Sequence, residues 1–78
     1  MSVYTANSPG DWSIVREPAR EAPSAVFDME CTTCGHSSGA TEEPEAVREW
    51  AARHVAGSPT HTGFREVVHR FWRAFPSG

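Results

Sequence analysis

Two cysteines and two histidines have the residue types and the spacing of a metal site. Cys31 and Cys34 lie two residues apart, and His54 and His61 follow them in the pattern Cys-x2-Cys-x19-His-x6-His. A Cys-x2-Cys turn can direct two thiolates at one ion, and structural zinc takes four such sulfur and nitrogen ligands in a tetrahedron. The sequence therefore predicts one structural Zn²⁺ per chain, held by Cys31, Cys34, His54 and His61.

The spacing differs from that of a standard two-Cys, two-His finger, and other interpretations stay open. Both linkers are longer than those of the DNA-reading finger, so a zinc site here would be a variant of it. The cysteines could instead be buried free thiols or a redox pair, although this sequence lacks the preceding βαβ pattern of redox pairs. His36 lies too close to Cys34 for a good ligand angle, and His69 is expected at the surface.

Outside this cluster, no arrangement of residue types is typical of catalysis. Ser37, Ser38 and the histidines form no recognisable triad, and the sequence has no glycine-rich phosphate loop. Four protein ligands would also leave no open position on zinc for a catalytic water. The sequence therefore predicts a protein that is not an enzyme.

The first two elements predicted to position the ligands are strands. Alternation of apolar and polar residues predicts one strand over Trp12–Arg16 and a second over Ala25–Cys31. In the second, Phe27, Met29 and Cys31 share a face, so the alternation brings the first zinc ligand to the core side.

The third predicted element is a helix over Glu42–Ala56. Thr41 can serve as its N-cap, and acidic residues follow in the first turn, where they suit the helix dipole. His54 lies at helical spacing from Trp50, on the apolar face, and Gly57 marks the end. The helix would thus present an imidazole to the core.

The last segment, residues 64–75, is compatible with either a helix or a strand. Its large apolar residues have helical spacing, but several are types that strands favour. From the residues alone, a helix and a strand are both open. The apolar residues are Phe64, Val67, Val68, Phe71, Trp72 and Phe75.

Together these elements predict an α+β fold, a small zinc-stapled and zinc-finger-like domain over residues 11–76. We expect the strands Trp12–Arg16 and Ala25–Cys31 to pair antiparallel, the helix to pack across them, and the last segment to complete the sheet. Trp50 should be buried beside the metal. Residues 1–10 are expected to be a flexible tail.

Composition limits the location and the partners. The chain has 78 residues and a formal net charge of −3, and all seven of its basic residues are arginine. It has no apolar run long enough for a membrane span, and its first residues lack the features of a signal peptide, so we expect a cytoplasmic protein without a membrane partner. The negative charge argues against non-specific nucleic-acid binding, although five arginines follow Pro44.

The order of these motifs resembles a set of short uncharacterised zinc-finger-like proteins of streptomycetes and related actinobacteria. The resemblance is carried by Cys31-Thr32-Thr33-Cys34-Gly35, by Trp50 and His54, by His61-Thr62-Gly63-Phe64-Arg65-Glu66 and by Phe71-Trp72-Arg73. The resemblance covers residues 12–76 and implies no established activity. It implies that the last segment is a strand and that the four zinc ligands carry over as they stand.

Two classes of function fit these features. The first is a small structural-zinc interaction or regulatory module that binds another protein. The alternative is a nucleic-acid-binding zinc-finger protein, against which the predicted helix carries four glutamates and only two arginines. As a strand, the last segment would leave aromatic and arginine side chains in water, where such groups anchor protein contacts. The expected partner-binding residues are Arg65, Arg70, Phe71, Trp72 and Arg73.

Overall fold

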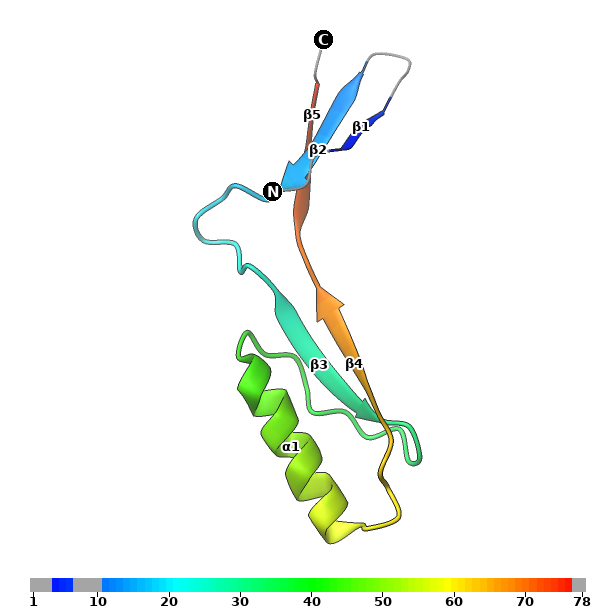
Figure 1. Ribbon diagram of the computed structural model, residues 1–78. Coiled ribbons are helices and arrows are strands. Elements are labelled where there is room, and N and C mark those ends of the chain that lie inside the picture. The colour runs from blue at the N-terminus through cyan, green and yellow to red at the C-terminus, as the bar shows by residue number, and fades with distance from the viewer. Residues whose placement is uncertain (1–3, 7–10, 77–78) are drawn as a thin grey trace. The chain divides into compact units, whose positions relative to one another are not determined.

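A computed structural model describes residues 4–6 and 11–76 of the chain (Figure 1). These residues form five strands and one helix, which divide between two compact units. The elements are β1 (Tyr4–Ala6), β2 (Trp12–Arg16), β3 (Val26–Cys31), α1 (Pro44–Gly57), β4 (Phe64–His69) and β5 (Trp72–Pro76). The predicted α+β class is confirmed.

The end unit is built from both ends of the chain, residues 1–24 and 70–78. Its described strands form an antiparallel sheet in the order β1-β2-β5. The β2–β5 register runs from Trp12 opposite Pro76 to Arg16 opposite Trp72. Beyond the strands, the backbone N–H of Glu17 donates to the carbonyl oxygen of Phe71 at 2.9 Å, which continues the same register by one pair.

The middle unit, residues 25–69, contains β3, α1 and β4. β3 and β4 pair antiparallel, from Val26 opposite His69 to Cys31 opposite Phe64. The segment after β3 returns along its other edge, where Thr41 exchanges two backbone hydrogen bonds with Phe27. β3 therefore has neighbours on both edges.

The core of the middle unit lies between α1 and one face of β3 (Figure 1). Ala25, Cys31 and Val47 are its buried apolar residues, and the last two are fully buried. Alternation along β3 explains the choice of face, because Ala25 and Cys31 are both odd-numbered and therefore point to the same side.

The helix begins two residues later and ends one residue later than predicted. Its N-cap residue is Glu43, which makes no side-chain cap hydrogen bond. The predicted cap, Thr41, instead accepts the backbone N–H of Glu43 at 3.1 Å through its hydroxyl oxygen. At the other end, the N–H of Ser58 donates to the carbonyl oxygens of His54 and Val55 at 3.0 and 3.2 Å. No helix among the described residues has the length and apolar character needed to cross a membrane.

The predicted pairing of the first two strands is wrong. β2 pairs with β5 and β3 pairs with β4, so each predicted strand takes its neighbour from the last segment of the chain. This segment is extended, but it is two strands, interrupted at Arg70 and Phe71. The interruption lets its two halves join different sheets.

The structure also describes part of the predicted N-terminal tail. Tyr4–Ala6 form β1, which pairs with β2 from Tyr4 opposite Ile14 to Ala6 opposite Trp12. The other residues of the segment 1–10 lie outside the described residues. The single-domain boundaries at 11 and 76 stay a prediction.

Candidate metal centre

Cys31 and Cys34 come from the end of β3 and the turn that follows it. Cys31 is the last residue of the strand, and the N–H of Gly35 donates to its carbonyl oxygen at 2.8 Å. Gly35 has a φ of +79°, a conformation that glycine adopts without steric cost. The N–H of Cys31 donates to the carbonyl oxygen of His36 at 2.9 Å, so the turn is held from both directions.

The two histidines come from the end of the helix and the loop after it. His54 lies in the last turn of α1. His61 lies in the loop that leads to β4, and its N–H donates to the carbonyl oxygen of Ser58 at 2.8 Å. The N–H of Thr32 donates to the carbonyl oxygen of Gly63 at 2.9 Å, which ties this loop to the cysteine turn.

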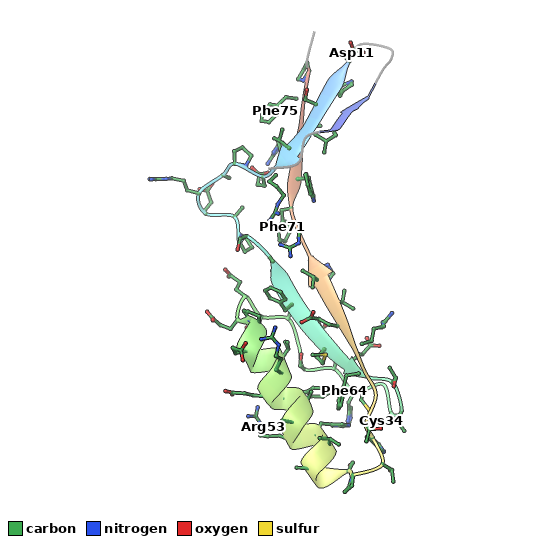
Figure 2. All side chains as sticks on the ribbon, in the orientation of Figure 1. Asp11, Cys34, Arg53, Phe64, Phe71 and Phe75 are labelled. Carbon is green, nitrogen blue, oxygen red and sulfur yellow. The ribbon has the colours of Figure 1, made fainter. Side chains whose placement is uncertain are left out.

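The four side chains converge on one point. One sulfur or nitrogen atom from each of Cys31, Cys34, His54 and His61 lies within 4.8 Å of all the others. The Sγ of Cys31 is 3.6 Å from Nδ1 of His61, and the Sγ of Cys34 is 3.5 Å from Nε2 of His54. Figure 2 shows Cys34 and Phe64 at the same end of the β3–β4 pair. The four predicted ligands are therefore positioned to bind a metal ion.

The two sulfur–nitrogen distances match edges of a zinc tetrahedron. With Zn–S bonds of about 2.3 Å and Zn–N bonds of about 2.0–2.1 Å, tetrahedral angles place sulfur and nitrogen about 3.6 Å apart. Both sulfur–nitrogen distances agree with this value to about 0.1 Å. Two thiolates and two imidazoles also match the ligand types of structural zinc, so the residues present fit the metal.

Aromatic rings surround His54. The indole of Trp50 stacks on its imidazole, with ring centroids 4.9 Å apart and planes 20° apart. The ring of Phe64 meets the same imidazole edge-on at 5.9 Å, and the ring of His61 lies 5.5 Å away. Trp50, predicted to be buried beside the metal, is half-buried and lies against the candidate ligand His54.

The two cysteines differ in exposure. Cys31 is fully buried, whereas Cys34 is exposed, and both are free thiols. Burial raises the pKa of the Cys31 thiol, but hydrogen bonds from the backbone and side chains of Cys34 and Thr33 together outweigh it, so the pKa lies below its usual value. This environment favours the thiolate, the form that binds metals.

Neither spare histidine joins the four-residue group. His36 is exposed, and its ring centroid is 6.1 Å from that of His54. His69 is also exposed and lies at the far end of β4, opposite Val26. The contact between Thr32 and Gly63 that ties the two ligand loops together was not predicted, because no local pattern in the sequence marks it.

The structure divides the predicted partner-binding residues between the two units. Arg65 is in the middle unit and pairs with Glu30 at 3.0 Å. Phe71, Trp72 and Arg73 are exposed in the end unit, as is Arg70. Two further exposed aromatic residues of the end unit, Trp12 and Phe75, were not among the predicted contact residues. Their role as partner contacts stays a prediction.

The model of a known protein family matches the chain over residues 1–78, and its description is a domain of unknown function, DUF7848. No curated protein and no solved structure matches the chain.

Proposed function

The chain belongs to this family of unknown function, and we propose from its own geometry that it is a structural-zinc module that binds another protein. The observation that carries the metal part of the proposal is the convergence of the four Cys2His2 ligand atoms within 4.8 Å of one another, with two sulfur–nitrogen pairs at 3.5 and 3.6 Å. The zinc would be structural, because four protein ligands complete its coordination.

A structural ion suits the small size of this core. Among residues 11–76, only three apolar residues are buried, and one of them is the candidate ligand Cys31. Domains with small cores commonly depend on a metal or a disulfide. Because the four ligands come from β3, its following turn, α1 and the next loop, one ion would link β3 and α1 to the loop that leads into β4.

Protein binding is favoured by the exposed aromatic residues of the end unit. Trp12, Phe71, Trp72 and Phe75 are each at least 40% exposed. Exposed aromatic groups beside arginine are the usual anchors of protein interfaces. Among residues 11–24 and 70–76, the end unit has no buried apolar residue, so a partner would supply apolar cover for its sheet.

The arginines argue for protein over nucleic acid. Of the five that follow Pro44, four pair with glutamate. The pairs are Arg48–Glu45, Arg53–Glu49, Arg65–Glu30 and Arg73–Glu17. Paired arginines present a weaker positive field to phosphate than free ones do.

The metal part is tested by native mass spectrometry and thermal unfolding of the zinc-loaded chain. The wild type should carry one zinc, and Cys31→Ser or His54→Ala should lose both the ion and most secondary structure, because zinc binding is linked to folding. His36→Ala is the matched control, and it should keep both. A metal-free chain with an unchanged, sharp melting transition would refute the structural role of zinc.

The partner class is tested separately on folded, zinc-loaded protein. The double variant Arg70→Glu, Trp72→Ser should lose a protein partner in a pull-down, and neither form should bind DNA in a gel shift. Tight DNA binding that weakens with salt and disappears in the double variant would favour the nucleic-acid alternative instead.

A further inference from the structure

We propose that the chain forms a two-fold symmetric dimer through the outer edge of β5, which pairs antiparallel with β5 of a second copy. The inference goes beyond the proposed function, because it rests on the sheet of the end unit and needs neither the metal nor a foreign partner. The direction of the backbone groups of β5, its self-complementary register, its charges and its contrast with β4 all support this dimer.

Among the described residues, the backbone of β5 has a strand partner on one side only. In the described sheet, β2 is the only neighbour of β5. The N–H of Glu17 donates to the oxygen of Phe71, so this is a hydrogen-bonded pair, and such pairs alternate along an antiparallel ladder. In the observed register, Arg73 and Phe75 are therefore hydrogen-bonded to β2. The backbone groups of Trp72, Ala74 and Pro76 point to the open edge.

The position of proline agrees with this assignment. Pro76 has no N–H, and proline in a sheet occurs where its nitrogen faces away from the neighbouring strand. Its partner in the register is Trp12, a non-hydrogen-bonded pair by the same alternation. Trp72 and Ala74 thus offer both a donor and an acceptor at the edge, and Pro76 offers an acceptor only.

A second copy of β5 can pair with this edge when the two-fold axis passes between the Ala74 residues of the two copies. Ala74 then lies opposite Ala74 of the second copy and exchanges two hydrogen bonds with it. Trp72 lies opposite Pro76 of the second copy, where the N–H of Trp72 donates to the proline oxygen. Because each copy makes the same contact, every N–H on the edge, those of Trp72 and Ala74, finds an acceptor.

The side chains are also complementary in this register. Trp72 packs beside Pro76 of the second copy on one face, and Arg73 lies opposite Phe75 of the second copy on the other. Both aromatic residues are 44% exposed in the single chain. The guanidinium of Arg73 is paired with Glu17 at 2.6 Å in its own unit, so the two copies bring together no unpaired like charges.

Among the described strands, β4 also has an edge without a neighbouring strand, but this edge does not suit a second copy. The N–H of Thr32 donates to the oxygen of Gly63, and alternation from this pair directs the backbone groups of Phe64, Glu66 and Val68 outward. Antiparallel self-pairing at the middle of these groups would place two Glu66 carboxylates directly opposite. Like charges in this position are destabilising, and charged residues commonly protect edges. β5 carries no charge among its outward-facing positions.

The test places charges at the proposed two-fold axis. Sedimentation velocity of the full, zinc-loaded chain should show a wild-type dimer that dissociates on dilution. Ala74→Lys and Ala74→Glu should each be monomeric, with the dimer dissociation constant raised about tenfold or more. An equimolar mixture of the two variants should dimerise again, because lysine then lies opposite glutamate. Ala74→Val, a neutral control, should stay dimeric.

The zinc content and the circular dichroism spectrum of each variant show whether it is folded, so that loss of association can be distinguished from loss of folding. A monomeric wild type across the accessible concentration range would overturn the proposal. So would a dimer that both charged variants retain, or two folded, zinc-loaded monomeric variants that fail to associate on mixing. Loss of zinc from the wild type would refute the proposed metal centre and leave the edge pairing to be decided by the mixing experiment.

Discussion

The indole of Trp50 stacks on the imidazole of His54 one helical turn away, with ring centroids 4.9 Å apart. The stack holds the imidazole with its Nε2 3.5 Å from the Sγ of Cys34. Removing a neighbour that orients a metal ligand commonly lowers the metal affinity by roughly 10–100-fold. Trp50 is therefore a positioning residue of the candidate centre.

Replacing Trp50 by alanine should lower zinc affinity by about tenfold or more, while Trp50→Phe should keep more of it, because a smaller ring still stacks. Competition with a chromogenic chelator measures both. Trp12→Ala, which removes an exposed indole from the end unit, is the control and should leave zinc affinity unchanged. Wild-type affinity in Trp50→Ala would show that the stack does not orient His54.

Gly35→Ala should destabilise the zinc-loaded chain by about 1–2 kcal/mol, the cost of a left-handed conformation for a residue with a Cβ. The site has room for the added methyl group, so the effect isolates backbone strain. Gly57→Ala, at the end of α1, also has room and no positive φ, and it should be neutral or stabilising. Chemical unfolding of both variants gives the comparison. Equal effects of the two changes would contradict a strained turn at Gly35.

Alkylation of the zinc-loaded chain should modify Cys34 before Cys31, because the first is exposed and the second is fully buried. Removal of the metal with a chelator should abolish the difference, since unfolding exposes both thiols. Peptide mass spectrometry over a time course reports the order. A difference in rate that survives chelation would show that the fold around the cysteines does not depend on the metal.

The carboxyl of Glu17 should titrate at low pH. Its pKa is held below the usual value by the backbone N–H of Ala19, which donates to it at 3.0 Å, and by the side chain of Arg73. Because the folded pKa lies below the unfolded one, these contacts stabilise the end unit above the unfolded value of about 4.3. That stability is lost as the pH falls through the folded pKa.

Carboxyl NMR titration tests this pH dependence directly. Arg73→Met should raise the pKa of Glu17 only part of the way, because the Ala19 hydrogen bond remains. Arg20→Met removes an exposed arginine from the same unit and is the control. An unchanged Glu17 pKa in Arg73→Met would mean that the ion pair does not form in solution.

The candidate centre could be predicted because its information is local. Cys31, Cys34 and Gly35 define a turn by themselves, and helical spacing from Trp50 places His54 on the apolar face. The strand pairings could not be predicted in the same way. Alternation shows that Trp12–Arg16 is a strand and which face is apolar, but it carries no information about which strand lies beside it.

No turn residue in the sequence predicts that the last segment divides into β4 and β5. Arg70 and Phe71 interrupt it without a glycine or proline. What defines the interruption is tertiary: the backbone of Phe71 accepts a hydrogen bond from Glu17, whereas the strand before it is paired with β3. The N-cap prediction failed for a related reason. Thr41 exchanges backbone hydrogen bonds with Phe27, and this strand-like pairing delays the helix to Pro44.

The pairing of Val26 with His69 has a consequence for the order in which the chain assembles. β2 and β5 are separated by most of the sequence, and the entropy lost on closing a loop grows with its length, by about 0.6 kcal/mol per doubling. Once the middle unit has folded, the two chain ends that leave it are neighbours, so β2 and β5 meet across a short effective loop. Metal capture in the middle unit would then precede and promote strand pairing in the end unit, with no ligand contributed by the end unit.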